Sequence, residues 1–211
     1  MIIKFDGVDG CGKSTLSKAV AESLSGTRHR VAVVSEFASP ALYTAGSAEP
    51  VPVTTMRIRE AVLDPTFDCD DVERQLLLHF LSRRKNRVEI PHLDRFHDYV
   101  IVDRSTLSNY AYAVALDPKL AALSDLAVGD VEKADRIFWI DTPVDVCMER
   151  MSIRQADAVE RKGRAYFERV RELFERYAVG HEATCTLDGR WEIPALVELV
   201  LAVVEGGRRD V

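Results

Sequence analysis

The stretch Gly7-Val-Asp-Gly-Cys-Gly-Lys-Ser14 matches the pattern G-x-x-x-x-G-K-[ST] at every fixed position. It follows an apolar run, Ile2 to Phe5, and precedes Leu16, Val20 and Leu24, which have the spacing of one helix face. Glycines in such a loop let backbone N–H groups surround a polyphosphate, while the lysine and the hydroxyl serve the phosphates and a Mg²⁺ ion. The dipole of the following helix favours the same anion. We therefore expect nucleotide contacts from Gly7, Asp9, Gly10, Cys11, Gly12, Lys13, Ser14 and Thr15.

Composition and charge restrict the class of protein. The 211 residues are 47% hydrophobic and 29% charged, which fits one soluble α/β domain spanning residues 1–211. The net charge of −6 argues against a nucleic-acid surface, and no apolar run approaches the length of a membrane span. The four cysteines are far apart and match neither a metal site nor a disulfide framework. We expect a cytoplasmic protein with a small-molecule partner, not a nucleic acid or a membrane.

Short apolar runs alternate with helical stretches along the chain, which is typical of buried parallel strands. Such alternation predicts a three-layer α/β/α fold with a five-stranded parallel sheet and the ligand at the carboxyl ends of the strands. The expected strands are Ile2 to Phe5, Val31 to Val34, Tyr99 to Val102, Ile137 to Ile140 and, more weakly, Ala183 to Leu187. Residues 38–53 are rich in Ala, Ser, Pro and Thr and are expected to form a long loop.

Two acids are candidates for the chemistry. Asp103 ends an expected strand, where an acid in a phosphate-loop protein can hold Mg²⁺ together with Ser14, and Arg104 would then lie beside the phosphates. The alternative is a helix N-cap followed by a surface arginine. Asp9 lies in the loop, where it could orient or partly deprotonate the nucleophile, or bind a sugar hydroxyl.

The expected helix from Asp71 to Ile90 carries Leu77, Phe80, Arg84 and Arg87 on one face. An aromatic ring one turn from an arginine can stack on a base while the guanidinium binds a phosphate or a base edge. The alternative places Phe80 in the core and leaves the basic cluster of residues 83–85 as a solvated face.

The segment from Met148 to Tyr177 is rich in arginine. A short lid at about residues 150–163 could bring positive charge to a migrating phosphoryl group, and Arg154 is its candidate catalytic residue. The alternative is that the arginines form ordinary helix pairs, Glu160 with Arg164 and Glu172 with Arg176.

Several segments resemble the thymidylate kinase family, in the right order along the chain. Phe5 to Leu16 is similar to the family's F-[ED]-G-x-[DE]-G-x-G-K-S/T, and Asp103 to Tyr112 to its D-R-[YF]-x-x-S-x-x-A-Y-Q. Leu77 to Glu89 resembles L-L-F-A-A-x-R, with Phe80 and Arg84 in the aromatic and arginine places. Further similarities are Ile58 to Leu63 with I-R-x-x-L-L, Ile140 to Arg150 with L-D-x-x-x-x-x-A-x-x-R, and Tyr166 to Arg171 with F-x-x-V-R.

The resemblance implies a P-loop kinase of nucleotide biosynthesis that moves the γ-phosphate of ATP to a nucleoside monophosphate with Mg²⁺. It implies that Arg104 and Arg84 bind the acceptor's phosphate and base, that Phe80 stacks on the base, and that Asp9 contacts the sugar. The matched motif also places Ser108 and Tyr112 at the acceptor site. The family further suggests a homodimer built on helices.

Three departures from the family pattern concern the acceptor. Residues 35–40 read Ser-Glu-Phe-Ala-Ser-Pro where the family has the phosphate-gripping arginine of R-E-P-G, so that Arg57 or Arg59 would have to replace it. Ala113 stands in place of a glutamine, and Ser105 in place of an aromatic residue, as in the [DE]-R-S of deoxynucleoside kinases. A lost charge-assisted hydrogen bond costs roughly 1.5–3 kcal/mol.

These departures leave three hypotheses. The first is a kinase of a (deoxy)pyrimidine nucleotide, which need not be thymidine monophosphate. The second is a deoxynucleoside kinase, whose acceptor has no phosphate to grip. The third is a non-catalytic protein that binds a nucleotide.

Overall fold

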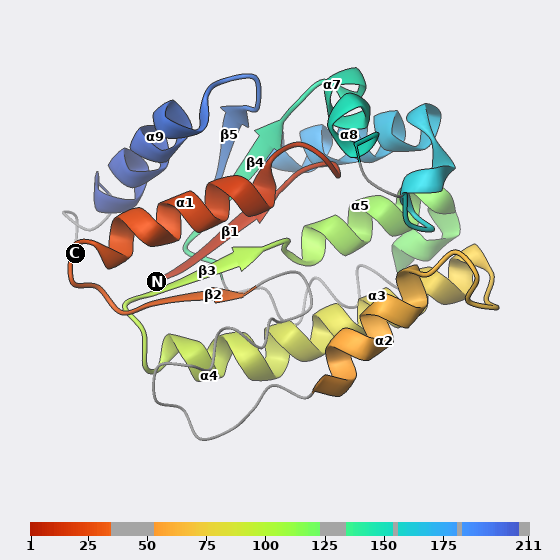
Figure 1. Ribbon diagram of the computed structural model, residues 1–211, viewed down its shortest axis with the longest axis horizontal. Helices are drawn as coiled ribbons and strands as arrows, with labels where there is room; N and C mark the ends of the chain where they lie inside the picture. The colour runs from red at the N-terminus through yellow and green to blue at the C-terminus, as the bar shows by residue number, and fades with distance from the viewer. Residues whose placement is uncertain (35–52, 123–133, 154–155, 181–182, 207–211) are drawn as a thin grey trace.

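The chain forms a five-stranded sheet in which every neighbouring pair of strands is parallel, in the order β2-β3-β1-β4-β5. The computed structural model describes residues 1–34, 53–122, 134–153, 156–180 and 183–206 (Figure 1). The strands are β1 (Ile2–Asp6), β2 (Val31–Val34), β3 (Tyr99–Asp103), β4 (Arg136–Asp141) and β5 (Thr184–Asp188). The predicted strands and the α/β/α class are therefore confirmed.

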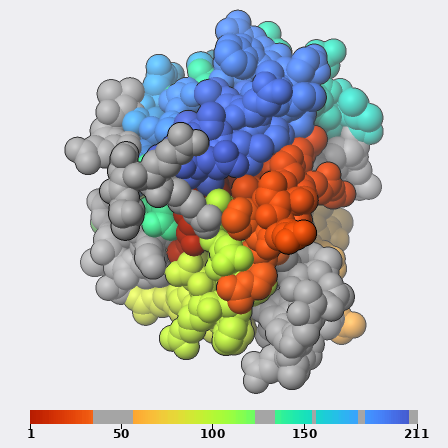
Figure 2. Space-filling view, turned by 90° about the vertical axis from the view of Figure 1, so that its left-hand side faces the viewer, coloured from red at the N-terminus to blue at the C-terminus, as the bar shows by residue number. Residues whose placement is uncertain are grey.

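Two layers of helices cover the sheet, as Figure 1 shows. One face carries α1 (Lys13–Ser25) and α9 (Ile193–Gly206), which lie directly against each other (Figure 2). The other face carries α3 (Asp71–Arg84), α4 (Ile90–Asp94), α5 (Thr106–Leu116) and α8 (Arg164–Gly180). Further out, α2 (Val53–Leu63) packs on α3, and α7 (Val144–Met151) packs on α8. The short turns are 3₁₀ segments η3 (Pro118–Leu120) and η4 (Glu160–Lys162).

Alternation along β1 separates a wholly apolar face from one that carries Ile2 and two charged side chains. Ile3 and Phe5 belong to the main core together with Leu16 of α1. Since successive strand residues point to opposite faces, Lys4 and Asp6 point to the other layer, and both are fully buried there. A lysine and an aspartate in a central strand require partners, and these come from the helices that cover that face.

The expected helix from Asp71 to Ile90 is not uniform. It begins with a capping box, in which Asp70 and Glu73 exchange side-chain and backbone hydrogen bonds. After Arg84, the backbone forms a π-helix, η2 (Lys85–Glu89), before α4 begins. A wider turn breaks the 3.6-residue period on which the prediction relied. Lys85 is buried, so residues 83–85 do not form a wholly solvated face.

None of the helices in the described ranges is long and apolar enough to cross a membrane. The candidate loop at residues 38–53 lies outside the described residues, except that Val53 begins α2.

Candidate active site

A cavity of about 590 Å³ opens at the carboxyl ends of β1, β3 and β4. The loop between β1 and α1 forms its centre, from Asp9 to Lys13. We call the part lined by Arg150 and the segment Gly189 to Ile193 one half of the cavity, because Arg150 bonds both to the loop and to Gly189. We call the part lined by Arg59, Gln75 and Arg104 the other half. A site with two halves on either side of a phosphate loop can hold two substrates at once.

The loop has a backbone shape that only glycine adopts without strain. Gly10 has φ +79°, and a Cβ there would overlap the backbone carbonyl of Cys147 in α7. Gly12 has φ +104° and stands at the N-cap of α1 without a side chain that could bond to the first N–H groups. The first turn of α1 therefore offers its N–H groups and its positive dipole end to an anion.

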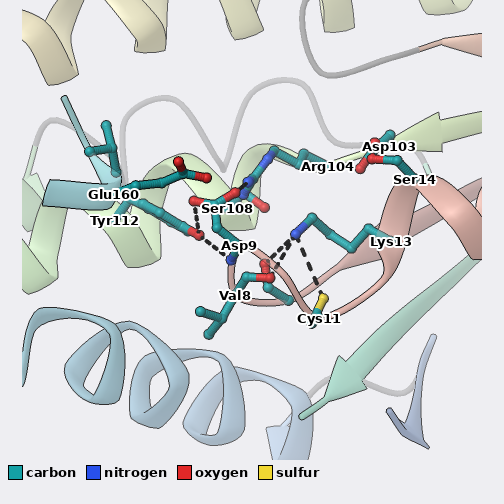
Figure 3. Close-up of polar contacts among 12 residues, drawn as sticks. Val8, Asp9, Cys11, Lys13, Ser14, Asp103, Arg104, Ser108, Tyr112 and Glu160 are labelled. Carbon is teal, nitrogen blue, oxygen red and sulfur yellow. Dashed lines mark hydrogen bonds and ion pairs between the residues drawn. The ribbon is translucent and has the colours of Figure 1, made fainter. Parts of the chain in front are cut away.

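Lys13 lies at the centre of this loop. Its side chain is buried, and its Nζ atom donates to the carbonyl oxygens of Gly7 and Val8, at 2.9 Å each (Figure 3). Two carbonyl bonds fix the ammonium where the loop curves around the cavity. A fixed positive charge at this point attracts a polyphosphate.

Ser14 and Asp103 form the candidate metal site. The Ser14 hydroxyl donates to Asp103 Oδ2 at 2.5 Å, while the buried Asp103 Oδ1 has no hydrogen-bond partner within the described part of the chain. An orphaned carboxylate oxygen beside a hydroxyl fits a hard divalent cation such as Mg²⁺. No cluster of three or more His, Cys, Asp or Glu side chains occurs among the described residues, so phosphates and water would have to complete the metal's coordination.

Asp9, Arg104 and Tyr112 form a compact group in the other half of the cavity. Arg104 Nη2 pairs with Asp9 Oδ1, and the guanidinium lies 5.1 Å from the centre of the Tyr112 ring. The Tyr112 hydroxyl accepts from the Asp9 N–H at 2.9 Å and donates to Asp9 Oδ2 at 2.8 Å (Figure 3). Burial raises the pKa of Tyr112 well above its usual value, so the hydroxyl stays protonated and continues to donate.

Arg104 has a left-handed backbone, with φ +69°, which is unusual for any residue other than glycine. Its N–H donates to the carbonyl of Phe5 at 2.9 Å, and its carbonyl accepts from Lys85 Nζ at 2.8 Å. Strained backbones persist where the surroundings over-determine them, and they are common at functional sites. These bonds direct the guanidinium of Arg104 toward Asp9.

Asp6 organises the start of α5. Its carboxylate accepts from the backbone N–H of Ser105 at 3.0 Å, from the Ser105 hydroxyl, and from the Ser108 hydroxyl at 2.6 Å. Ser105 is also the N-cap of α5. Ser108 lines the cavity as expected, but its hydroxyl is directed to Asp6. Serine at position 105 therefore has a structural partner in this chain.

The structure does not bring every predicted residue to the cavity. Arg59 lines it, whereas Arg57 is exposed on α2 and does not belong to the wall. Phe80 is 62% exposed, Arg84 pairs with Glu89, and neither lies in the wall; α3 contributes Gln75 and Leu78 instead. Arg154 lies outside the described residues.

Arg150 is a site residue that the motif analysis quoted without assigning a role. Its Nη1 atom donates to the carbonyls of Gly10 and Cys11 at 3.4 Å each, and Nη2 donates to the carbonyl of Gly189 at 3.3 Å. It thus joins the phosphate loop to the segment before α9. Nothing in the sequence pattern indicated Gln75, because no motif includes it.

The interpretation of the arginine-rich segment as ordinary helix pairs is correct only in part. Glu172 and Arg176 form an exposed pair at 3.9 Å, but Arg164 pairs with Glu168 at 2.7 Å. Glu160 belongs to η4, is buried at the cavity wall, and points toward the group formed by Asp9 and Arg104 (Figure 3).

Comparison with known proteins gives a consistent result. A family model described as thymidylate kinase matches residues 5–200. A thymidylate kinase of Thermosipho africanus is 28% identical, covering 97% of this chain and 98% of that protein. A thymidylate kinase of Pseudomonas fluorescens is 33% identical, covering 82% of this chain and 80% of that protein. The chain therefore belongs to the thymidylate kinase family of nucleotide kinases.

Proposed function

We propose that the protein transfers the γ-phosphate of ATP, with Mg²⁺, to a (deoxy)pyrimidine nucleoside monophosphate. One observation carries the proposal. A single cavity joins a phosphate loop, with Lys13 and the Ser14–Asp103 pair, to a second half that contains Arg59, Asp9 and Arg104. Donor and acceptor would meet at the loop, so that catalysis depends on positioning and electrostatics without a covalent intermediate.

The donor would occupy the half walled by the loop, Arg150 and the segment Gly189 to Ile193. Backbone N–H groups at the start of α1 and the Lys13 ammonium would hold the β and γ phosphates. Arg150 already bridges the two segments of this wall, so it needs little rearrangement to contact the nucleotide.

Ser14 and Asp103 would hold Mg²⁺, since their donor set and the orphaned Oδ1 atom fit that ion. Bound Mg²⁺ would neutralise charge on the phosphate oxygens. Lys13 and the other residues of the cavity would then orient the two substrates around the bound Mg²⁺. The catalytic role of Arg154, in a short lid at about residues 150–163, stays a prediction. Residues 154–155 of that segment lie outside the described residues.

The acceptor would occupy the half that contains Arg59, Arg104 and Asp9. Arg59 is in the cavity wall, where a guanidinium can bind the acceptor phosphate in place of the arginine that residues 35–40 lack. Arg104 would bind the same phosphate, and Asp9 would bind the sugar or orient the nucleophilic oxygen. A guanidinium in this wall supports a monophosphate acceptor, because it can form a charge-assisted hydrogen bond with the phosphate.

A deoxynucleoside kinase is the second candidate, favoured by the Asp103-Arg104-Ser105 sequence. A non-catalytic nucleotide-binding protein is the third. A panel of nucleosides and monophosphates, modified pyrimidines included, incubated with Mg·ATP while ADP is measured, separates all three. The proposal predicts turnover with a monophosphate, little with its nucleoside, and loss of turnover in Lys13→Ala. Turnover with nucleosides only, or ATP binding without any transfer, would contradict it.

A homodimer built on helices and a cytoplasmic location stay predictions. Phe80 on α3, Val88 on η2 and Phe96 after α4 are large apolar side chains with more than half of their surface exposed, which supports an interface on these helices. Light scattering on the purified protein tests the dimer. A monomer at micromolar concentration would contradict it.

A further inference from the structure

Thr142 is a buried threonine that contacts the phosphate loop from outside the cavity. It directly follows β4 and is only 1% exposed. It is not among the described residues that line the cavity. Its hydroxyl donates to the backbone carbonyl oxygen of Cys11 at 3.3 Å. The side chain therefore joins the end of a central strand to the middle of the phosphate loop.

The bond to Cys11 fixes the orientation of the next peptide group. The peptide between Cys11 and Gly12 is trans, so its C=O and N–H groups point in opposite directions. Thr142 and Arg150 Nη1 both donate to the Cys11 carbonyl, at 3.3 and 3.4 Å. The Gly12 N–H is thereby directed away from Thr142, toward the cavity that Gly12 lines. The N–H groups of such a loop are the ones that surround a polyphosphate.

The packing around Thr142 holds its side chain in place. A Cβ atom on Gly189 would lie 1.8 Å from Thr142 Oγ1, so the backbone after β5 packs directly on the hydroxyl. The Gly189 N–H donates to the carbonyl of Asp141 at 2.9 Å, which fixes that backbone. On the other side, the Cys147 thiol of α7 donates to the Thr142 carbonyl at 3.8 Å. A side chain that is held by its surroundings can position a binding group precisely.

We propose that Thr142 is a positioning residue for the donor phosphates, because its hydroxyl holds the Cys11 carbonyl and so directs the Gly12 N–H to the phosphates. The inference rests on the proposed function, since it names a residue that prepares the loop for ATP. A loop that already has its binding conformation loses less freedom when the anion binds. Arg59 and Arg104 of the acceptor half come from other elements, so the effect of Thr142 is confined to the donor.

Two variants that differ only in the hydroxyl test the proposal. Thr142→Ala removes the bond to Cys11, whereas Thr142→Ser keeps it, and both lack the methyl group. Loss of one neutral hydrogen bond should raise the Kd for Mg·ATP roughly 2- to 12-fold in Thr142→Ala, with KM for the acceptor unchanged. Thr142→Ser should bind Mg·ATP like the unmodified protein. Thr142→Val, a second variant without the hydroxyl, should resemble Thr142→Ala. Calorimetry measures each Kd.

Inorganic tripolyphosphate separates the loop from the rest of the donor half, since it has the phosphates without base or sugar. If Thr142 acts through the loop, the Kd for tripolyphosphate should rise in Thr142→Ala by the same factor as that for ATP. A role through the packing of Gly189 would weaken ATP alone, and that result would overturn the proposal. Failure of the unmodified protein to bind tripolyphosphate would overturn it as well.

Thr184 on β5 provides the matched control. Its buried Oγ1 atom has no hydrogen-bond partner within the described ranges, so Thr184→Ala and Thr184→Ser should bind ATP equally well. Equal Kd values for ATP in Thr142→Ala and Thr142→Ser would show that the hydroxyl of Thr142 has no positioning role. Binding of ATP without transfer to any monophosphate would instead overturn the proposed function, and the binding data would still decide the role of Thr142.

Discussion

The ammonium of Lys85 donates a 2.8 Å hydrogen bond to the backbone carbonyl of Arg104, and both residues are buried. Lys85 keeps the α-helical backbone of α3, with its N–H bonded to the Leu81 carbonyl, and the π-helical turn of η2 begins at its own carbonyl, which accepts from the N–H of Ile90. The Lys85–Arg104 bond holds the left-handed backbone of Arg104 from outside the cavity. Lys85 is therefore a positioning residue for the Arg104–Asp9 pair.

Replacing Lys85 with Met should disturb acceptor use more than donor use. The apolar side chain fills the same space but releases the Arg104 carbonyl, so the guanidinium loses its fixed direction. A misplacement of about 1 Å can cost roughly 100-fold in rate, and we expect kcat/KM for the acceptor to fall roughly 10- to 100-fold with KM for ATP unchanged. Steady-state kinetics with each substrate varied in turn would measure this split.

Lys4 provides the matched control, because it is another buried lysine in the same layer. Its Nζ atom donates to the side chain of Asn86, at 3.3 Å from Oδ1, whereas Lys85 donates to the Arg104 carbonyl. Lys4→Met should alter stability without a selective change in acceptor kinetics. Equal kinetic effects of the two variants would show that Lys85 acts only through general stability.

Arg59→Ala should raise KM for the acceptor and leave KM for ATP unchanged. Losing a charge-assisted bond to phosphate costs roughly 1.5–3 kcal/mol, which corresponds to about a 10- to 150-fold change. Arg57→Ala is the control, since Arg57 is exposed on the same helix outside the cavity wall. Initial-rate measurements on both variants give the KM for the acceptor and the KM for ATP, and so test whether Arg59 binds the acceptor. An effect in Arg57→Ala as large as that in Arg59→Ala would contradict the assignment.

The fold could be predicted from the sequence because its signals are local. Buried parallel strands have short apolar runs that end in polar residues, and the phosphate loop has a fixed spacing. The bonds of Lys13 and the Ser14–Asp103 pair follow from that loop and from the register, in which Phe5 of β1 lies opposite Asp103 of β3. Local pattern and strand order together were sufficient to predict that Ser14 and Asp103 lie side by side, and their role stays a prediction.

The acceptor half could not be predicted in the same way. Residues two apart on a helix differ by about 200° in direction, so Arg57 and Arg59 occupy opposite sides of α2. The same rotation separates Leu78, which lines the cavity, from Phe80, which is exposed. Choosing between such positions requires knowing which face of a helix meets its neighbours. The sequence contains no local signal for that.

Asp103→Asn should weaken the use of Mg²⁺ more than the binding of nucleotide. The amide keeps the shape of the side chain but removes the negative charge from the orphaned oxygen. We expect the Mg²⁺ concentration for half-maximal activity to rise at least roughly tenfold. Nucleotide binding without Mg²⁺, measured by calorimetry, should be unchanged or stronger. An unaltered Mg²⁺ dependence would exclude Asp103 as a ligand of the metal.

Asp98 should contribute to acid stability. Hydrogen bonds from the Arg30 side chain and from its backbone N–H lower the pKa of Asp98 from its ordinary value of 3.8 to about 2. Because the pKa is lower in the folded state, the stabilisation is complete well above pH 3.8 and disappears as the pH falls toward 2. Asp98→Asn should therefore be less stable than the unmodified protein at pH 7, and the difference should shrink with acidification. Urea unfolding at several pH values measures this, and a difference that grows at low pH would contradict it.

The cysteine inside the phosphate loop should be unreactive toward thiol reagents. Burial raises the pKa of Cys11 despite the opposing effect of Lys13, and burial together with Cys11 raises the pKa of Cys147 to about 12. Since the thiolate is the nucleophile, neither should react quickly at pH 8, whereas the partly exposed Cys69 and Cys185 should. Labelling with a chromogenic disulfide should show two fast thiols in the native protein and four in urea. A double variant, Cys69→Ser with Cys185→Ser, should show none that are fast. Rapid labelling of Cys11 with loss of activity would contradict the prediction and would make the loop sensitive to oxidation.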